Sequence, residues 1–351
     1  ITNPFGLSTA VGTGPFSLQQ WIRGDRIIFR RHAGYYGGPV AAQEYVYQVV
    51  RSSEELLASL REGTIDWAEL DPAAAAEAEQ VDGVAVERLP SFDMTYVALQ
   101  LDRAKSTLFT DPRVRRALML ALDREAAVNE FWQGHADIAD GTLPPASWAY
   151  RASATVYRPD LDAARQLLDE AGWVPGPDGV RVKDGVPLRF TLTTNGDNPR
   201  RRQVAEWLIR SWQALGIAVE PEFETWSTVR QRVIQERDFD AVLLGYRWSV
   251  DPDQSMLWSS DSFFDGLNVG HYASAEVDAL LQRALQATDR AERAELYAQM
   301  QEQVMQDLPV IPLAFPHVLV ARSERLQAGE ITAILVRNRA DIAQWVPVVG
   351  E

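Results

Sequence analysis

The stretch RFTLTTNGDNPRRRQVAEWLIRSWQALGIAVEPEF, residues 189–223, defines the architecture of the chain. Arg189–Thr194 has the composition of a β-strand, and the Asn-Pro pair at 198–199 then opens a helix whose apolar side chains recur at helical spacing. Gly216 is the expected stop of that helix, and a second β-rich run, Ile217–Phe223, follows at once. A strand, a helix and a strand in this succession predict an α/β lobe.

Strands and helices continue to alternate after residue 100, which predicts mixed β-sheets flanked by helices. One helix is predicted to begin in DPRVRRALMLALDRE (111–125) and to end before Gly134, with Asp111 or Thr110 as its cap. Before residue 101 strands dominate, and a tight turn at Gly24-Asp25 joins two of them as a hairpin. The other predicted elements are strands at 26–31, 45–50, 84–89, 96–101, 241–246, 310–315 and 318–321, and helices at 53–62, 161–172, 229–236, 274–287 and 289–309.

The bulk composition describes an ordinary globular protein with enough apolar residues for sizeable cores. Its 351 residues, 46% of them hydrophobic, suggest two domains or two lobes. Lys and Arg number 34 against 49 Asp and Glu, and the net charge of −15 argues against nucleic acid or an anionic membrane surface as a partner. Because the chain has no cysteine, disulfides, thiolate metal sites and a cysteine nucleophile are excluded. No apolar run approaches the length of a membrane span.

Motifs for catalysis or metal binding are missing from the sequence. The four histidines show no HxxH or HExxH spacing, and no GxSxG marks a hydrolase nucleophile. The glycines at 12 and 14 lack the third glycine of a dinucleotide fingerprint and the lysine of a P-loop. Asp251 and Asp253 flank Pro252, where carboxylates more often shape a turn than perform acid–base chemistry. We therefore predict no catalytic residue, no metal ligand and no cofactor.

Aromatic and amide side chains gather where predicted strands end. Trp148, Trp226 and Trp248 lie in loops or directly after strands, and ligands of open α/β lobes bind at such ends. Asn195 ends a strand and Asn268 precedes the strand-like NVGHY, so both can offer amide hydrogen bonds. A flat aromatic wall with such neighbours suits a peptide, a sugar chain or another organic solute. The alternative is that the tryptophans plug the edges of lobes and the asparagines only shape turns.

Several segments with distinctive patterns are spread over the whole chain. In chain order they are VGTGPFSLQQWIRGDRIIFRR (11–31), DPRVRRALMLALDRE (111–125), LDAARQLLDEAGW (161–173), DFDAVLLGYRWSVDPD (238–253), NVGHYASAEVDALL (268–281) and DLPVIPLAF (307–315). Together they resemble the extracytoplasmic solute-binding proteins of ABC importers, family 5, the class that binds peptides and nickel. The resemblance covers essentially the whole chain and rests on the ordered set, since each motif alone is only moderately specific.

The resemblance implies a two-lobe, periplasmic-binding-protein-like fold of type II, a Venus flytrap whose lobes close over a solute. On this basis residues 1–95 with 321–351 are expected to be the remaining part of lobe I, and 96–320 a complete lobe II. In the family the hairpin at 11–31 lies well inside the chain. We therefore expect an incomplete first lobe, with its N-terminal part a companion chain, an unresolved segment or a truncation. The expected location is extracytoplasmic, either periplasmic or lipid-anchored on the outer face of the cell membrane.

The resemblance also assigns residues to the ligand. Trp226 matches a position where an aromatic often walls the cleft, and Tyr246 matches a common cleft tryptophan. Where peptide binders keep an aspartate for the ligand's α-ammonium, this chain has Ser249. This departure weakens the case for a free peptide, since a buried ammonium needs a charged partner. Asp251 would replace that aspartate if the loop shifts by two residues, and Arg247 would favour an anionic group or face solvent.

The main hypothesis is the substrate-binding component of an ABC importer. It would capture a peptide-like or other medium-sized organic solute in a cleft between the lobes and deliver it to the permease subunits in the membrane. No catalysis is required, so the protein is not expected to be an enzyme. Two alternatives stay open, a carboxylate-based glycosidase on a similar frame and a receptor that senses the ligand without transporting it. The sequence leaves the ligand open among peptides, sugars, opines and metal complexes.

Overall fold

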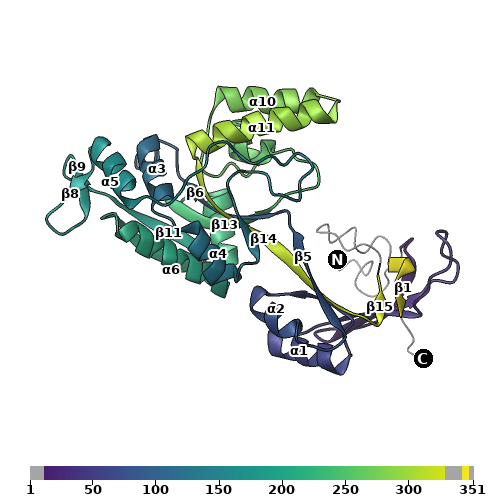
Figure 1. Cartoon of the computed structure of the whole chain (residues 1–351). Coiled ribbons are helices and arrows are strands. Elements are labelled where there is room, and N and C mark those ends of the chain that lie inside the picture. The colour runs from purple at the N-terminus through teal and green to yellow at the C-terminus, as the bar shows by residue number, and fades with distance from the viewer. Residues whose placement is uncertain (1–11, 329–341, 348–351) are drawn as a thin grey trace, which may run out of the picture. The chain divides into compact units, whose positions relative to one another are not determined.

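The computed structural model describes residues 12–328 and 342–347, and the chain folds into two compact units (Figure 1). The first unit consists of the chain up to Leu89 and from His317 onward, and the second is Pro90–Pro316. The lobe boundaries predicted from the sequence lie a few residues from the boundaries between these two units. The assignment of the units to lobes stays a prediction. Within the described ranges no helix combines the length and the apolar character that a membrane span needs.

The second unit is built on a mixed sheet. Three strands, β11 (Arg189–Asn195), β12 (Ala218–Glu224) and β13 (Ala241–Arg247), run parallel in the order β12–β11–β13. β6 (Asp93–Leu99) pairs antiparallel with β13, and the first half of β14 (Val310–Ser323) pairs antiparallel with β6. The strand–helix–strand unit thus forms as predicted, and its two strands are neighbours in the sheet. The α/β class and the mixed sheet are confirmed.

The helix α6 (Pro199–Gln213) shows how local sequence builds this unit. The side chain of Asn198 accepts a hydrogen bond from the backbone N–H of Arg201, and the proline that follows Asn198 stands where its missing N–H would have no helical partner. Gly216, with a φ of 81°, closes the C-terminal end in the left-handed region. α6 packs against β11 and β12 (Figure 1). Its Trp212 side chain is completely buried. Burial of one large apolar side chain stabilises a core by roughly 2–3 kcal/mol.

The helix predicted from Asp111 to just before Gly134 is wrong in one respect, because the structure divides it in two. α3 (Pro112–Leu120) ends before Asp123, whose side chain accepts a hydrogen bond from a backbone N–H of the next turn. This bond caps a new helix, α4 (Arg124–Trp132), and so interrupts an apolar stripe that looks continuous in the sequence. The cap predicted at Asp111 is confirmed. Residues of α3, α4 and α6 share one apolar core.

Two further elements differ from the prediction. The apolar runs on either side of Pro316 form the single strand β14, because the fixed φ of proline fits an extended chain wherever its missing N–H is not needed. The helix expected at 229–236 begins earlier, as α7 (Trp226–Val229), and continues as a π-helix, η1 (Arg230–Gln235). Its earlier start follows from Thr225, whose hydroxyl caps α7.

The second unit also contains a small three-stranded sheet and a group of helices close to its C-terminal end. Its remaining elements are β7 (Ala136–Ile138), α5 (Leu161–Glu170), β8 (Val174–Pro175), β9 (Arg181–Lys183), β10 (Val186–Pro187), α8 (Ser255–Trp258), α9 (Ser262–Asp265), α10 (Ala275–Gln286) and α11 (Arg290–Asp307). α10 and α11 lie side by side (Figure 1). The side chain of Gln301, on α11, accepts hydrogen bonds from the backbone N–H groups of Thr142 and Leu143 at 2.9 and 3.0 Å. This buried amide fixes the proline-rich loop that follows to the helix.

The first unit contains a three-stranded antiparallel sheet of β1 (Phe16–Ile22), β2 (Arg26–Arg31) and β3 (Glu44–Gln48). The predicted hairpin is confirmed, since the last residue of β1 pairs with the first of β2 across Gly24, whose φ of 77° suits glycine. Its other elements are α1 (Ser53–Glu62), β4 (Trp67–Leu70), α2 (Pro72–Ala78), β5 (Val84–Pro90), β15 (Leu326–Gln327), η3 (Ile342–Gln344) and β16 (Val346–Pro347). The second half of β14 pairs with β4 and with β5, and α1 and α2 pack with these strands in a small core.

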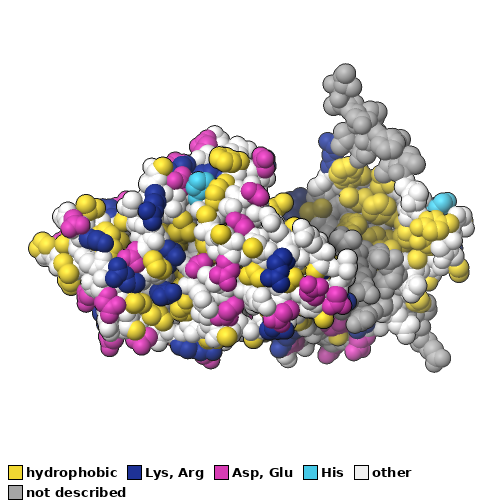
Figure 2. Space-filling model, turned by 90° about the horizontal axis from the view of Figure 1, so that it is seen from above, with side chains coloured by type: hydrophobic (Ala, Val, Ile, Leu, Met, Phe, Trp, Pro, Cys, Tyr) yellow, Lys and Arg dark blue, Asp and Glu magenta, His cyan; other side chains and the backbone are white. Residues whose placement is uncertain are grey.

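The surfaces of the two units differ in character. Acidic and basic side chains are interspersed over the face of the second unit that Figure 2 shows at left. Apolar side chains gather on the first unit, where the exposed ones include Trp21, Tyr36 and Val46 (Figure 2). This face of the second unit therefore carries no large field of one charge sign, of the kind that attracts nucleic acid.

Candidate ligand-binding site

The carboxyl ends of the three parallel strands lie at one edge of the sheet. β11 ends at Asn195, which stands opposite Glu224, the last residue of β12. β13 ends with Tyr246 and Arg247, and Trp226 opens α7 just after β12. Ligands of open α/β sheets bind at this edge, because the loops there let side chains and backbone groups converge on a solute. Of the predicted ligand residues, the fold brings Asn195, Trp226, Tyr246 and Arg247 to it.

Arg201, in the first turn of α6, reaches the same edge and connects its parts. Its Nη1 donates a 2.6 Å hydrogen bond to Oδ1 of Asn195, and its Cζ lies 6.0 Å from the centre of the Trp226 ring. Its Nη2 lies 2.7 Å from the point that a Cβ on Gly245 would occupy, so the glycine leaves the room that the guanidinium takes. Asn195 is held in turn, since its Nδ2 donates to the carboxylate of Asp197 at 2.7 Å.

The charge of Arg201 is only lightly compensated. Burial lowers the pKa of its guanidinium, and the nearby Tyr96 and Asp197 act in the opposite direction. No carboxylate of the described residues forms an ion pair with it, and its one side-chain hydrogen bond within them goes to the neutral amide of Asn195. Sequence reasoning missed Arg201, because a run of three arginines does not reveal which of them the helix turns toward the strand ends.

Two aromatic side chains at this edge are accessible. Trp226 is 43% exposed, and Tyr246 is half-buried. The ring of Tyr246 meets that of Trp248 edge to face, with ring centres 4.7 Å apart. Trp248 is buried: its backbone N–H donates to the carbonyl of Phe92 at 2.8 Å, and its indole N–H finds no acceptor in the part of the chain that the structure describes. Trp226 and Tyr246 are thus the aromatic surfaces open to a solute here, and Trp248 packs against one of them.

The guanidinium of Arg247 is paired within the sheet. Its Nε and Nη2 donate to the two carboxylate oxygens of Asp93, both at 2.7 Å. The two residues stand opposite each other on β13 and β6. Bidentate pairs of this kind are among the stronger charge-assisted hydrogen bonds. The positive charge of Arg247 is therefore committed to Asp93, and its contact with a ligand stays a prediction.

Three other predicted ligand residues, Trp148, Ser249 and Asp251, belong to a separate group around Arg293 of α11. Nη2 and Nη1 of Arg293 lie 3.0 and 3.2 Å from the two carboxylate oxygens of Asp251, and its Cζ lies 5.7 Å from the centre of the Trp148 ring. The hydroxyl of Ser249 donates to the backbone carbonyl of Asp251 at 2.7 Å. Burial acts to raise the pKa of Asp251, but hydrogen bonds from Arg293 and the Asp253 backbone bring it below its ordinary value. The Asp251 carboxylate is therefore ionised and already paired.

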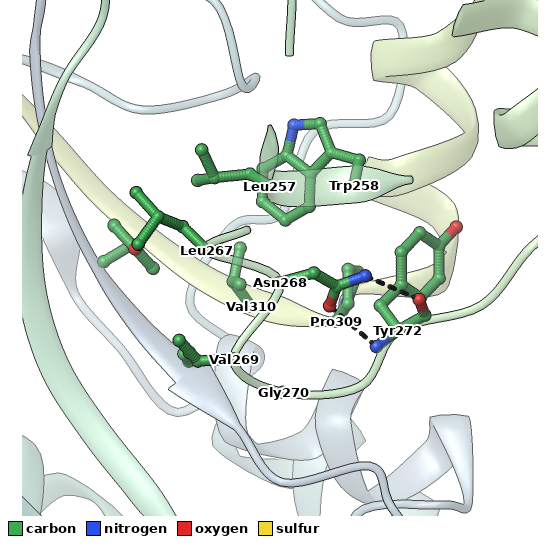
Figure 3. Close-up of a pocket in the computed structure, with 11 residues that line it drawn as sticks. Leu257, Trp258, Leu267, Asn268, Val269, Gly270, Tyr272, Pro309 and Val310 are labelled. Carbon is green, nitrogen blue, oxygen red and sulfur yellow. Dashed lines mark hydrogen bonds between the residues drawn. The ribbon is translucent and has the colours of Figure 1, made fainter. Parts of the chain in front are cut away.

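Asn268 lies in a loop beside a small cavity (Figure 3). Its Nδ2 donates to the carbonyls of Ser259 and Tyr272 at 3.0 and 2.8 Å, and its Oδ1 accepts from the N–H of Tyr272 at 2.9 Å. The cavity, lined by Trp258 and Tyr272 among others, has a volume of about 20 Å³. That is room for about one water molecule and too little for an organic solute. The loop pairs with Leu101, beyond the end of β6, so the amide organises this loop and does not join the residues at the carboxyl edge.

The carboxyl edge offers groups for binding rather than for metal ligation. Searched over the described ranges, the chain has no group of three or more His, Asp and Glu that could hold a metal ion. Asp93 and Asp197 are engaged by Arg247 and Asn195, and Glu224 alone receives no side-chain hydrogen bond from the described residues. A guanidinium and two aromatic surfaces are thus what a solute would meet, while the buried amide of Asn195 holds the guanidinium in place.

Comparisons with known proteins agree with one another. The family model described as bacterial extracellular solute-binding proteins, family 5 Middle, matches residues 3–266. The chain is 30% identical over 329 residues to the oligopeptide-binding protein AppA of Bacillus subtilis. The alignment covers 93% of this chain and 60% of AppA. It is 34% identical over 302 residues to protein XP55 of Streptomyces lividans, and that alignment covers 85% of this chain and 54% of XP55. The chain thus spans little more than half the length of these curated relatives.

The fold also matches solved structures. The structure of AppA from Bacillus subtilis in complex with a nonapeptide superposes with a TM-score of 0.79 at 29% sequence identity. The match covers 95% of this chain and 66% of that one. The agreement extends over almost all of the chain, including both compact units.

Proposed function

Because the chain belongs to the bacterial extracellular solute-binding proteins of family 5, we propose that it is the substrate-binding component of an ABC importer. It captures a peptide-like or other medium-sized organic solute and delivers it unaltered to permease subunits in the membrane. It works outside the cytoplasm, either in the periplasm or anchored by lipid on the outer face of the cell membrane. The similarity to AppA, an oligopeptide-binding protein by name, supports a solute of this size.

The observation that carries the proposal is the convergence of Arg201, Asn195, Trp226 and Tyr246 on one edge of the sheet. The indole and the phenol supply apolar surface, and the guanidinium, held by the buried amide of Asn195, supplies hydrogen bonds. Such a set holds a solute by desolvation and shape, with no group that attacks it. The edge falls within residues 96–320, which we assign to lobe II, while 1–95 with 321–351 belong to lobe I; closure of the lobes over the solute stays a prediction.

No specific observation favours the glycosidase alternative. That chemistry needs two carboxyl groups facing each other across a pocket, one of them free to donate a proton. Asp93, the first residue of β6, and Asp251, in the loop after β13, are each paired with an arginine. No observation on the structure favours a sensing receptor over a transport component.

Native mass spectrometry of the purified chain tests the proposed function. We expect a co-purifying organic compound that denaturation releases with its mass unchanged. Trp226→Ala should then weaken binding of that compound by about tenfold, through loss of the aromatic wall. Trp21→Ala is the matched control, because Trp21 lies on the first unit and is 42% exposed against 43% for Trp226. Chemical conversion of the compound, or equal losses in the two variants, would contradict the proposal.

A further inference from the structure

The balance of charges at the carboxyl edge points to the solute group that is recognised there. We propose that Arg201 binds a carboxylate of the solute, so that the second unit selects anionic solutes and does not grip a peptide by its α-ammonium. This inference rests on the function proposed above. It concerns the side chains at the carboxyl ends of β11, β12 and β13 and the first turn of α6.

Arg201 forms no ion pair with any of the residues described. Two neighbouring arginines do have anionic partners. Arg247 donates two 2.7 Å hydrogen bonds to Asp93, and Nη1 of Arg232 lies 2.7 Å from Oε1 of Glu222. A partly buried guanidinium is costly to keep without a counter-charge. A solute carboxylate would supply that charge, and its two oxygens match the parallel N–H donors of the guanidinium fork.

The carboxylates that an ammonium group would need are, with one exception, engaged by other side chains of the chain. Ser249 replaces the aspartate that the family resemblance predicts for this purpose, and Asp251 is held by two hydrogen bonds from Arg293. Asp197 accepts from the amide of Asn195. Glu224 remains, at the end of β12, as the single carboxylate of this edge that no described side chain engages. If an ammonium were bound here, Glu224 would be the residue that binds it. Binding of a carboxylate should therefore depend on Arg201, and binding of an ammonium on Glu224.

The surroundings of Arg201 also suit an anion attached to an organic body. Its Nη1 is tethered to Asn195, so the guanidinium is held in place before a ligand arrives. Gly245 presents no side chain beside Nη2. A carboxylate on the remaining donors would bring the body of the solute toward Trp226, whose ring centre lies 6.0 Å from Cζ. The charge and the aromatic wall thus act on adjacent parts of one molecule.

A matched set of organic acids and their primary amides tests the inference by thermal-shift titration of the purified chain. N-acetyl amino acids, N-acetyl dipeptides and sugar acids serve as probes, each beside its amide. We expect acids, and not their amides, to raise the melting temperature. Arg201→Gln should weaken the best acid by about ten- to a hundredfold, the effect of losing a charged hydrogen-bond partner. Arg201→Lys should keep the preference for acids with part of the affinity, because the charge remains while the fork is lost.

The control variant is Arg202→Gln, since Arg202 is exposed on the same helix and pairs with Glu206 at 3.2 Å. It should bind the best acid as the unaltered chain does, and the melting temperature of each unliganded variant separates loss of binding from loss of folding. Equal binding of acids and amides, unchanged affinity in Arg201→Gln, or loss of affinity in Glu224→Gln would overturn the inference.

Failure of the inference and failure of the proposed function look different. If a co-purified compound binds reversibly but no acid of the set stabilises the chain, carboxylate recognition fails and the binding function stands. If no compound co-purifies and neither acids nor amides stabilise the chain, the binding function fails as well.

Discussion

The Nη2 atom of Arg201 lies 2.7 Å from the point that a Cβ on Gly245 would occupy. Arg201 comes from the first turn of α6 and Gly245 from the carboxyl end of β13, so only the fold brings them together. The missing side chain at Gly245 is what lets the guanidinium reach the strand ends. A side chain added at position 245 would therefore collide with the guanidinium at the proposed anion site.

Replacement of Gly245 by alanine is therefore expected to displace the guanidinium and to weaken solute binding by about tenfold. The free energy of unfolding should change by less than about 1 kcal/mol, because Gly245 is exposed and the flexible end of an arginine is what must move. Isothermal titration calorimetry with the co-purified compound and urea unfolding measure the two quantities. Gly12→Ala is the control, since nothing lies within 4 Å of its added Cβ. Unchanged affinity in Gly245→Ala would show that the position of the guanidinium is irrelevant to binding.

Asp251 is expected to contribute little to ligand recognition, because Arg293 occupies its carboxylate. Asp251→Asn should leave the affinity for the co-purified compound unchanged within about twofold and lower the free energy of unfolding by less than about 1 kcal/mol, as for a half-exposed ion pair. Competition binding and urea unfolding provide the measurements. A tenfold or greater loss of affinity would restore Asp251 as the substitute for the missing ammonium partner.

The buried amide of Gln301 should be a strong determinant of stability. In Gln301→Leu the backbone N–H groups of Thr142 and Leu143 lose their acceptor, which is expected to cost about 2–4 kcal/mol of the free energy of unfolding. Gln299→Leu, on the exposed side of the same helix, is the matched control and should cost much less. Urea denaturation of both variants distinguishes them, and similar losses would refute a special role for the buried network.

Glu302 should make stability depend on pH. Burial acts to raise the pKa of its carboxyl, but hydrogen bonds from Thr155 and Ser153 outweigh this and lower the pKa from 4.5 to about 2. Since the folded-state pKa is the lower one, protonation favours the unfolded chain. The stabilisation is complete above about pH 4.5 and is lost as the pH falls through about 2.

Glu302→Gln is accordingly expected to lower the free energy of unfolding by about 1–3 kcal/mol at neutral pH. The difference from the unaltered chain should shrink as the pH falls toward about 2. Urea unfolding over this pH range measures it, with Glu130→Gln on the exposed face of α4 as control. A difference that stays constant across the acid range would mean that the carboxylate charge is not the cause.

Elements with their own start and stop signals were predictable from the sequence. The helix at 53–62 forms within its predicted bounds, since the Ser52 side chain caps its start and Gly63 ends it in the left-handed region. The break at Asp123 was not foreseen, because the apolar stripe continues past it in the sequence, while the side chain of Asp123 caps a new helix in the structure. The family resemblance, carried by segments in order along the chain, is confirmed.

The candidate site was predictable in part. The ends of β11, β12 and β13 could be named from the sequence, and the parallel pairing then brings Asn195, Trp226 and Tyr246 to one edge. Arg201 could not be named, because its direction depends on how α6 packs against the sheet. The ligand contact of Asp251 stays a prediction, and its pairing with Arg293 of α11 could not be read from the sequence.

By itself the sequence determined where elements with clear start and stop signals lie and to which family the chain is related. Those signals act over a few residues, through periodicity, caps and turns. Only the tertiary structure decided which charges remain unpaired, because an ion pair depends on what the fold brings within a few ångströms. Arg247 and Asp251 found charged partners on other elements, whereas the guanidinium of Arg201 forms its hydrogen bond to an amide and no ion pair with a described carboxylate.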